Sequence, residues 1–346
     1  MDDKELPFVS IVMPIRNEAD FIERTLNSVL GNDYPSEKME VLVADGSSDD
    51  GTQEIVRRIG EKDSRVKLLQ NAGKIVSTGL NIALRKSKGE VFIRIDGHCE
   101  IGKDFIRKSI NCLQEHSEAW VCGGYWKTIS QGYIGKAIAT ATQTPIGVGN
   151  AKHRLGNFDG WVDTLPYGVH HHWVVEKIGY FDEELVRNQD DEFNLRVRLA
   201  GGKIWLSSSI WSIYYSRSSL KKLWRQYFQY GFWRIRTLQK HKRPATVRQV
   251  IPIFFLLSII TFAVGGFVLD IFWWALLAEL SIYLLVQILG IFSVGRKSGW
   301  QYAPAAVIVF AILHFGYGLG GLWGIVRFIL LRRKWMKPPT EFKLSR

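Results

Sequence analysis

The feature that most constrains this chain is a change of composition near residue 250. From there the sequence contains three apolar segments, at about 250–269, 271–293 and 303–331. Each is near or above the roughly 20 residues that a helix needs to cross the hydrocarbon core of a membrane. One such segment alone could be the buried core helix of a soluble protein. Three in succession, with tryptophan and tyrosine near their ends, favour membrane spans.

The first 200 residues alternate between strand and helix patterns. Continuous apolar runs rich in β-branched residues predict strands buried on both faces, and amphipathic spacing predicts the helices between them. The expected strands are 8–15, 39–45, 65–71 and 90–96, and the expected helices are 19–31, 50–62 and 76–89. This order predicts an α/β domain with a mostly parallel, doubly wound sheet, in which ligands bind beyond the carboxyl ends of the strands.

Two acidic residues stand at such strand ends. Asp45 closes the second expected strand and Asp96 closes the fourth, so both should face one crevice. Either residue alone would be read as a loop acid or a helix cap, but together they indicate a nucleotide and metal site. The chain has no G-x-G-x-x-G after the first strand and no P-loop motif. A divalent ion on a carboxylate can hold a phosphate instead.

A long basic stretch links these two parts of the chain. No acidic residue occurs between Glu192 and Asp270, and the basic residues there account for the formal net charge of +12. Residues 218–242 have helical spacing with an apolar side and a basic side, which is typical of a helix lying on anionic lipid. A solvated helix face would not explain the aromatic residues. A nucleic-acid surface is less economical beside membrane spans, so we expect membrane lipids and no nucleic acid as partners.

Five sequence motifs within residues 8–205 resemble, in order and spacing, those of glycosyltransferase family 2, which has the GT-A fold. They are SIVMPIRNEADFIERTLNSVL, VLVADGSSDDGT, RIDGH, VEKIGYFDEEL and NQDDEFNLRVRLAGGKI. The finer resemblance is to the membrane-bound branch that makes succinoglycan and related exopolysaccharides. It extends more loosely over the whole chain, through HFGYGLGGLWG at 314–324.

The resemblance implies a layout for the chain. We expect a Rossmann-like GT-A catalytic domain at 1–215 and a basic amphipathic interface region at 216–248. A transmembrane region of about three segments should follow at 249–335, with a basic tail at 336–346. The last membrane segment, which is rich in glycine, could be re-entrant or broken.

The resemblance also implies roles for residues at the strand ends. Asp96 would be the first acid of the metal motif, and His98 stands where most relatives have a second aspartate. Imidazole suits Mn²⁺ better than Mg²⁺, so we expect Mn²⁺ (or Mg²⁺) as cofactor, unless His98 is a turn residue that never touches metal. Asp45 matches the position that binds the uracil base. The other expected nucleotide-binding residues are Pro14, Arg16, Glu18 and Lys74, although Glu18 can equally be a helix-start acid.

The catalytic base is expected at the start of the helix in NQDDEFNLRVRL. An acceptor hydroxyl must lose its proton as it attacks the anomeric carbon, and one carboxylate suffices for a single displacement with inversion. The glutamate–aspartate motif of the family aligns with Gln189 and Asp190, so Asp190 is the expected base and Asp191 the alternative. Both acids could instead only complement the helix dipole. The expected acceptor- or phosphate-binding residues are His171, Gln229, Tyr230 and Arg234.

The sequence therefore predicts an inverting, metal-dependent glycosyltransferase of the cytoplasmic membrane, with a cytosolic catalytic domain. It would move one sugar, a hexose with glucose as first candidate, from a UDP-sugar to a polyprenyl-(di)phosphate-linked saccharide in polysaccharide biosynthesis. Two alternatives remain. A processive polysaccharide synthase would carry Q-x-x-R-W where this chain has QYGFWR. A non-catalytic membrane scaffold would keep the fold and bind a nucleotide or a lipid-linked glycan.

Overall fold

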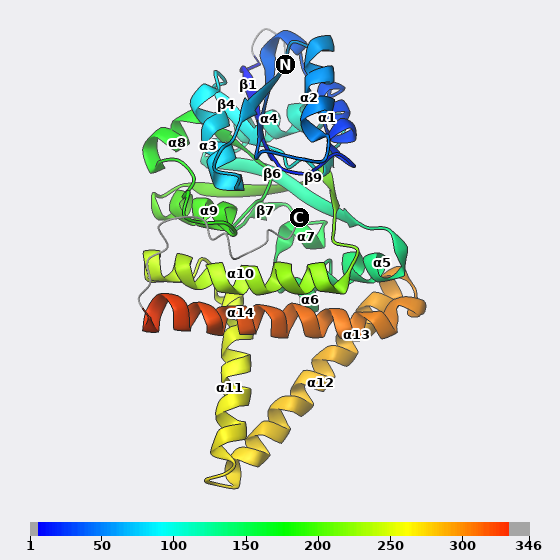
Figure 1. Ribbon diagram of the computed structural model, residues 1–346, viewed down its shortest axis with the longest axis vertical. Helices are drawn as coiled ribbons and strands as arrows, with labels where there is room; N and C mark the ends of the chain where they lie inside the picture. Colours follow the sequence, from blue (N-terminus) through cyan, green and yellow to red (C-terminus); the bar gives the residue numbers. More distant parts are fainter. Residues whose placement is uncertain (1–5, 332–346) are drawn as a thin grey trace.

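The computed structural model describes residues 6–331 and contains a single sheet, a layer of long helices beneath it and a projecting pair of helices (Figure 1). The strands are β1 (Val9–Ile15), β2 (Met39–Asp45), β3 (Val66–Gln70), β4 (Val91–Arg94), β5 (Cys99–Ile101), β6 (Ala119–Ile129), β7 (Gly160–Trp161), β8 (Gly168–His171) and β9 (Lys203–Tyr215). The helices of the sheet domain are α1 (Ile22–Leu30), α2 (Thr52–Lys62), α3 (Val76–Lys86), α4 (Phe105–Glu115), α5 (Gly132–Ala141), α6 (Pro145–Val148), α7 (Lys152–Leu155), α8 (His172–Ile178) and α9 (Gln189–Leu199).

The sheet has a parallel half and a mixed half. Its main order is β3-β2-β1-β4-β8-β6-β9-β5, and β1, β2, β3 and β4 run parallel, as the alternating pattern predicts. In the other half β8 runs antiparallel to both β4 and β6, while β6 and β9 form a long parallel pair. The sheet as a whole is therefore mixed, because β8 enters it in the opposite direction beside β4.

Helices cover both faces of this sheet. One core packs α1, α2 and α4 against the strands, through residues such as Leu26, Val56 and Ile110. The other core packs α3, α8 and α9 against the opposite face, through residues such as Leu80 and Phe193. The expected helices at 19–31, 50–62 and 76–89 correspond to α1, α2 and α3. This arrangement leaves the carboxyl ends of β1 and β4 open toward the helical layer below.

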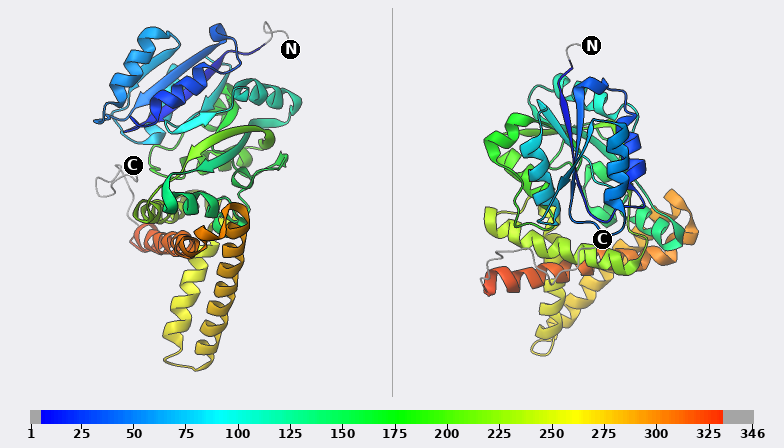
Figure 2. Two further views of the ribbon diagram at one scale, coloured as in Figure 1. Left: turned by 90° about the vertical axis from the view of Figure 1, so that its right-hand side faces the viewer. Right: turned by 45° about the horizontal axis from the view of Figure 1, so that its top comes forward.

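The helical layer consists of α10 (Leu220–His241) and a long helical run lying beside it (Figures 1 and 2). That run is α13 (Ala303–Ala311), a π-helical turn (Ile312–Gly316), α14 (Tyr317–Gly324) and a second π-helical segment (Ile325–Leu330). The glycine-rich stretch is thus an unbroken helix. Its glycines let two backbones touch, because a Cβ on Gly320 would lie 2.0 Å from the carbonyl oxygen of Phe228 on α10.

Residues 218–242 form the expected helix, since α10 begins after Ser219, whose side chain accepts a hydrogen bond from the backbone of Lys222. Its surroundings differ from the expectation, because much of its apolar side is covered by protein rather than left for lipid. Phe232 and Trp233 of α10 are fully buried against Phe328 and against the loop before α9. Helix α10 therefore joins the sheet domain to α14.

The two remaining helices form a hairpin that projects away from the body of the molecule (Figures 1 and 2). They are α11 (Ile251–Gly265) and α12 (Ile271–Ser298), and both expose many large apolar side chains. By length and composition, α12 and the run Trp300–Leu330 are each long and apolar enough to cross a membrane. The latter lies along α10 rather than along the hairpin. The expected basic tail at 336–346 lies outside the described residues.

Candidate active site

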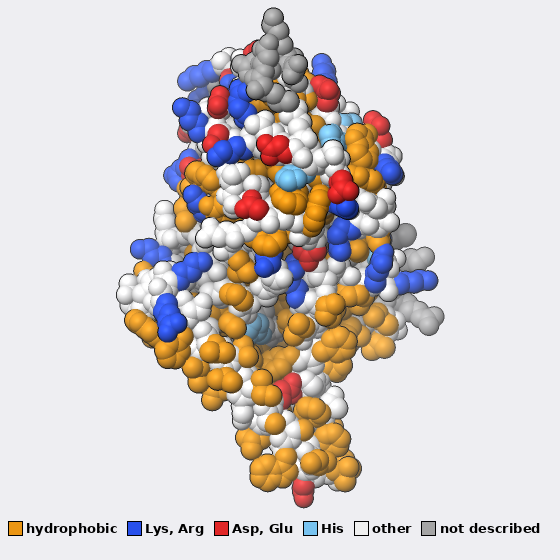
Figure 3. Space-filling view, turned by 180° about the vertical axis from the view of Figure 1, so that it is seen from behind, with side chains coloured by type: hydrophobic (Ala, Val, Ile, Leu, Met, Phe, Trp, Pro, Cys, Tyr) orange, Lys and Arg blue, Asp and Glu red, His pale blue; other side chains and the backbone are white. Residues whose placement is uncertain are grey.

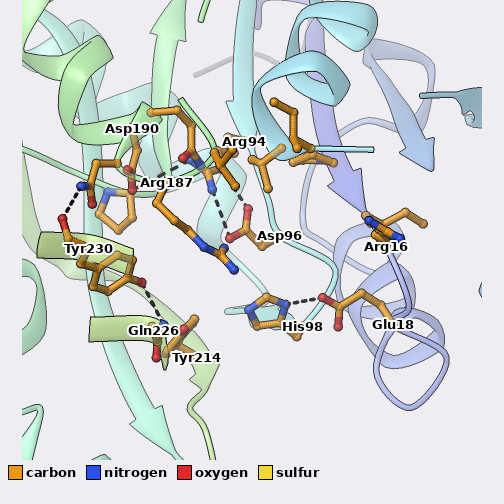
Figure 4. A pocket seen from close by; sticks show the side chains of 18 of the residues that line it. Arg16, Glu18, Arg94, Asp96, His98, Arg187, Asp190, Tyr214, Gln226 and Tyr230 are labelled. Carbon is orange, nitrogen blue, oxygen red and sulfur yellow. Dashed lines mark hydrogen bonds and ion pairs between the residues drawn. The ribbon is translucent and has the colours of Figure 1, made fainter. Parts of the chain in front are cut away.

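A cavity of about 130 Å³ opens at the carboxyl ends of β1 and β4, where the parallel sheet predicts a ligand site (Figure 4). Strand β1 and the loop after it contribute Pro14, Arg16 and Glu18, and strand β4 with its loop contributes Arg94, Asp96 and His98. The opposite wall comes from the start of α9 and from α10, with Arg187, Asp190, Gln226 and Tyr230. The cavity thus collects charged and polar side chains from four separate parts of the chain.

Arg94 lies on the floor of this cavity and holds Asp96. Its Nε donates to Asp96 Oδ1 at 2.9 Å and its Nη2 donates to Oδ2 at 3.2 Å. Nη1 of Arg94 lies 3.9 Å from Oδ2 of Asp190. Burial raises the pKa of the Asp96 carboxyl, but the attraction of Arg94 and then of His98 outweighs it and leaves that pKa lowered. Asp96 is therefore held as a carboxylate by a buried arginine that also faces Asp190.

Asp190 and Asp191 start helix α9 but have different partners. Asp191 accepts hydrogen bonds from Thr164 Oγ1 at 2.8 Å, from Gln249 Nε2 at 3.2 Å and from Arg234. Burial raises the pKa of Asp191, but the attraction of Arg234 outweighs it, so the pKa is lowered. Within residues 6–331, Asp190 accepts a hydrogen bond only from the backbone N–H of Asp191, at 2.9 Å.

The environment of Asp190 suits a proton acceptor. Burial first, and the charge of Asp191 second, raise the pKa of Asp190 above its ordinary value, against the opposing attraction of Arg94. A carboxylate with a raised pKa is a stronger base, and Asp190 also lines the cavity. Of the two acids predicted from the sequence, Asp190 is the one whose position fits a general base.

His98 and Glu18 form a pair at the edge of the cavity (Figure 4). Nδ1 of His98 lies 2.8 Å from Oε1 of Glu18, so the carboxylate accepts a hydrogen bond from the N–H of that nitrogen, and a neutral imidazole then has its lone pair on Nε2. This is the tautomer that ligates metals, with a carboxylate behind the imidazole. Glu18 is almost fully buried.

The side chains at this edge of the cavity suit a divalent ion whose remaining coordination positions are filled by a substrate and water. Within residues 6–331, the carboxylates, imidazoles and thiols form no cluster of three or more that could hold a metal ion. Asp96 and His98 would supply two ligands to such an ion, because each oxygen of Asp96 keeps a second lone pair beside its bond to Arg94. Divalent ions at phosphate sites take one or two protein ligands and fill the remaining positions with phosphate and water.

The other expected nucleotide-binding residues separate into two groups. Pro14, Arg16 and Lys74 line the cavity together with Glu18 and Asp96. Asp45 does not line it. The Asp45 carboxylate is almost fully buried and accepts hydrogen bonds from Gln53 Nε2 at 2.6 Å and from the backbone N–H of Ser48 at 3.0 Å. In this structure Asp45 shapes the loop after β2.

The residues expected to bind the acceptor or its phosphate also lie in different places. Tyr230 lines the cavity. Arg234 is buried and ion-paired with Asp191, and Gln229 is buried and accepts from Arg187 Nε at 3.1 Å. Residue His171 stacks on Trp173, with ring centroids 5.7 Å apart, and lines neither this cavity nor the larger one described below. The structure therefore does not bring His171 to the site.

Sequence reasoning missed several residues of the site, of which Arg94 and Arg154 are the most informative. Arg94 had a usable signal, because residues two apart on a strand share a face, so Arg94 must accompany Asp96. Arg154 lies on the short helix α7, outside the five motifs quoted above. Its guanidinium lies 4.7 Å from the centre of the Trp126 ring.

A second cavity, of about 940 Å³, meets the first one at Asp190. Both cavities are lined by Trp126, Pro166, Asn188, Asp190 and Tyr230. From there the larger cavity runs down between α11 and α12, past Phe255, Phe262, Ala275 and Ala278. Asp190 thus stands where a small polar cavity and a large, mainly apolar cavity join.

The fold and this site define a GT-A-type protein, and comparison with known proteins shows what the chain is similar to. Residues 10–157 match the model of "Glycosyl transferase family 2". The succinoglycan biosynthesis protein ExoA of Rhizobium meliloti is 28% identical over 327 residues, which cover 92% of this chain and 96% of that protein.

Two further proteins are similar over most of the chain. One is the dolichyl N-acetyl-α-D-glucosaminyl phosphate 3-β-D-2,3-diacetamido-2,3-dideoxy-β-D-glucuronosyltransferase of Methanococcus voltae. It is 27% identical over 81% of this chain and 88% of its own length. The other is a solved structure, the mannosyltransferase PcManGT of Pyrobaculum calidifontis in complex with GDP-Man and Mn²⁺. It aligns with a TM-score of 0.59 and 18% identity over 93% of this chain and 89% of that chain. This likeness confirms the predicted GT-A fold.

Proposed function

We propose that this protein transfers one sugar from a UDP-sugar to a hydroxyl of a polyprenyl-(di)phosphate-linked saccharide, with inversion at the anomeric carbon, in the synthesis of a polysaccharide or other glycan. The observation that carries the proposal is the position of Asp190, at the junction of a polar cavity and an apolar one. A nucleotide sugar suits the first cavity and a lipid-borne acceptor suits the second. The names of two relatives, one in succinoglycan biosynthesis and one acting on a dolichyl phosphate sugar, support this assignment.

The polar cavity carries the cations that a nucleoside diphosphate needs. Arg16 and Lys74 line it, and within residues 6–331 neither has a carboxylate partner. Arg94 adds a buried positive charge on the floor. Asp96 and His98 would hold Mn²⁺ or Mg²⁺ here, and such an ion would neutralise the charge that develops on the leaving diphosphate. The resemblance to the family favours uridine as the nucleoside and a hexose as the sugar.

The reaction requires a single displacement. The acceptor oxygen forms a bond to the anomeric carbon while the bond from that carbon to the diphosphate breaks, and the electron pair leaves with the nucleoside diphosphate. The hydroxyl proton moves to the carboxylate of Asp190, whose raised pKa strengthens it as a base. Arg94 keeps Asp96 ionised and faces Asp190, so it fixes the relative position of the two carboxylates.

The hairpin of α11 and α12 suits insertion into a membrane from the side of the catalytic domain. Arg296 and Lys297 end α12 on that side. Basic residues favour the cytosolic face of a membrane, so we place the catalytic domain in the cytosol. The resulting protein is anchored in the cytoplasmic membrane, with its active site close to the lipid surface.

The test is release of nucleoside diphosphate by the full chain in lipid nanodiscs. A panel of nucleotide sugars is supplied with Mn²⁺, with and without a polyprenyl-diphosphate-sugar. One UDP-sugar should give acceptor-dependent release, and Asp190→Asn should reduce kcat by about 10²–10⁴-fold, the usual contribution of a general base. Asp33→Asn is the matched control, because Asp33 is a half-exposed surface acid remote from the cavity.

Two results would contradict the proposal. Acceptor-dependent release that survives Asp190→Asn would exclude Asp190 as the base. Nucleotide binding without transfer to any lipid-linked acceptor would favour the scaffold alternative. The length of the product distinguishes this proposal from a processive polysaccharide synthase. Such a synthase would extend one acceptor many times, whereas this proposal predicts the addition of one sugar.

A further inference from the structure

The larger cavity has walls of two kinds. Near the catalytic acids its lining includes the cationic residues Arg154, Arg234 and Arg248. Farther down its lining is apolar and comes from the hairpin, with Ile251, Pro252, Phe255 and Phe262 on one side and Ala275, Ala278, Ile282 and Val286 on the other. In Figure 3 the molecule is hollowed where the hairpin meets the body, with apolar side chains around the hollow. This larger cavity, called the chamber below, therefore changes from cationic near Asp190 to mainly apolar between the hairpin helices.

The three arginines differ in how their charge is matched. Arg234 is ion-paired with Asp191. Arg248 donates to both oxygens of Asp163, at 2.7 and 3.2 Å. Within the described part of the chain, the guanidinium of Arg154 has no ion pair and no hydrogen bond, and it lies 4.7 Å from the centre of the Trp126 ring and 5.8 Å from that of Tyr214. Arg154 is thus the cation of the chamber whose donors are left for a ligand.

The electrostatic surroundings keep Arg154 charged. Burial opposes its charge, but the neighbouring tyrosines and the carboxylate of Asp190 outweigh burial and leave its pKa raised. The imidazole beside it is neutral, because burial first, and Arg154 second, lower the pKa of His153 to about 3. A phosphate bound here would meet one full positive charge with unused donors, in a partly desolvated place where such a contact is strong.

We propose that this chamber binds the lipid part of the acceptor, with the phosphate on Arg154 and the polyisoprenoid tail between α11 and α12. The inference rests on the proposed function and deepens it, because it states where the acceptor lipid is held and by which residues. An anionic lipid with a branched apolar tail matches both ends of the chamber. The sugar that the lipid carries then points to the junction at Asp190.

The two walls of the chamber are fixed to each other at mid-depth. Ser258 on α11 donates a hydrogen bond to Oε1 of Glu279 on α12 at 2.5 Å. Both residues line the chamber. A carboxyl group between apolar helices is costly unless it has a partner, so this pair is a specific link. It holds the helices at the separation that leaves room for a tail.

The test measures binding rather than transfer. The full chain in nanodiscs of phosphatidylethanolamine and phosphatidylglycerol is irradiated with a photoreactive analogue of undecaprenyl phosphate, and the labelled peptides are identified by mass spectrometry. Labelling should fall on chamber-lining residues of α11 and α12. Undecaprenyl phosphate should compete for labelling, whereas undecaprenol and dioleoyl phosphatidic acid should not.

Two pairs of variants sharpen the test. Arg154→Met should weaken binding of the probe by at least about tenfold, the usual effect of losing a hydrogen-bonded charge. Lys152→Met, on the same short helix but outside the chamber, should leave binding unchanged. Ala278→Phe should fill the chamber and abolish labelling there. Leu284→Phe, on the exposed outer side of α12, should not.

Each other outcome overturns the inference. Three results would contradict it: labelling on the outer surface of the hairpin, equal competition by phosphatidic acid, or unchanged binding in both Arg154→Met and Ala278→Phe. The binding test and the transferase assay can fail independently of each other. Specific capture of the probe without sugar transfer would contradict the proposed function alone, whereas normal transfer with labelling elsewhere would contradict the chamber alone.

Discussion

Asp190 and Asp191 are adjacent in the chain but differ in their electrostatic surroundings, and this difference predicts a pH dependence. Asp190 must be ionised to accept a proton, and its pKa is raised. The kcat/KM value should therefore fall as the pH drops through a value above that of an ordinary carboxylate. The charge of Asp191 is the second cause of the raised pKa, so Asp191→Asn should shift this acid limb to lower pH. A profile of kcat/KM against pH checks the shift. An acid limb that stays in place or moves upward would contradict the assignment of Asp190.

Arg94 predicts a pH-dependent loss of stability. Removing it in Arg94→Met leaves the largely buried Asp96 carboxylate without its ion-pair partner, which should cost about 3–5 kcal/mol. The folded-state pKa of Asp96 is lowered, so its contribution to stability is present above the unfolded-state pKa and is lost as the pH falls through the folded-state pKa. The deficit in melting temperature should therefore be large at pH 7 and smaller at about pH 3, below the ordinary pKa of aspartate.

The control for this experiment is Arg85→Met. Arg85 is half-exposed and lies 3.6 Å from the half-exposed Glu183, and surface pairs of this kind contribute about 0–1 kcal/mol. Differential scanning fluorimetry at both pH values compares the two variants. A deficit in Arg94→Met that does not depend on pH would mean that Arg94 acts by packing and not through Asp96.

At the scale of residues, sequence patterns predict most of the small polar cavity and little of the larger one. The polar cavity is lined by residues at or just after the ends of two strands, and these ends must share one edge of a parallel sheet. They are Pro14, Arg16, Glu18, Asp96 and His98. The partners of Asp191 come from segments 27 to 58 residues away in the chain. No local spacing encodes such contacts, and the ion pair of Arg234 with Asp191 was therefore not predicted.

Among the elements, the contact of α10 with α14 predicts a position-specific effect of alanine. A Cβ on Gly320 would lie 2.0 Å from the carbonyl oxygen of Phe228, which cannot move without shifting α10. Gly320→Ala should therefore destabilise the protein by about 1–3 kcal/mol through overpacking. A Cβ on Gly316 would have its nearest contact at 3.5 Å, an ordinary distance, so Gly316→Ala should be neutral. Melting temperatures in detergent test the pair, and equal effects would mean that the helices do not touch as described.

The same contact shows that the last of the three expected membrane segments has different neighbours from the first two. By hydropathy alone, residues 303–331 have the same membrane-span pattern as the two apolar segments before them. Glycines at 318, 320, 321 and 324 instead form a face that fits closely against α10 and α11. Apolar composition reports only that a helix avoids water, and it does not distinguish lipid from protein as the partner. The element was predictable, but its neighbours were not.

At the scale of the whole molecule, the helical layer connects the candidate active site to the apolar hairpin. Helix α10 contacts the sheet domain on one side and α14 on the other. Arg234 of α10 reaches Asp191 at the start of α9 and also donates to Tyr317 Oη of α14 at 3.3 Å. The position of α9 is thereby tied to α14, so direct contacts join the proposed base to the helices beneath the sheet domain.

The path of the hairpin gives a last prediction, about topology. A helix of the length of α11, Ile251–Gly265, spans about 22 Å, less than the roughly 30 Å of a hydrocarbon core. The turn after it is apolar, with Phe267 and Val268 largely exposed. The hairpin should therefore enter the membrane and return to the catalytic side. In right-side-out vesicles, Arg296→Cys should react with a membrane-impermeant maleimide only after permeabilisation, and Val268→Cys should react in neither case. The three native cysteines are buried and give a low background. Labelling of either variant from outside would show that the chain crosses the membrane completely.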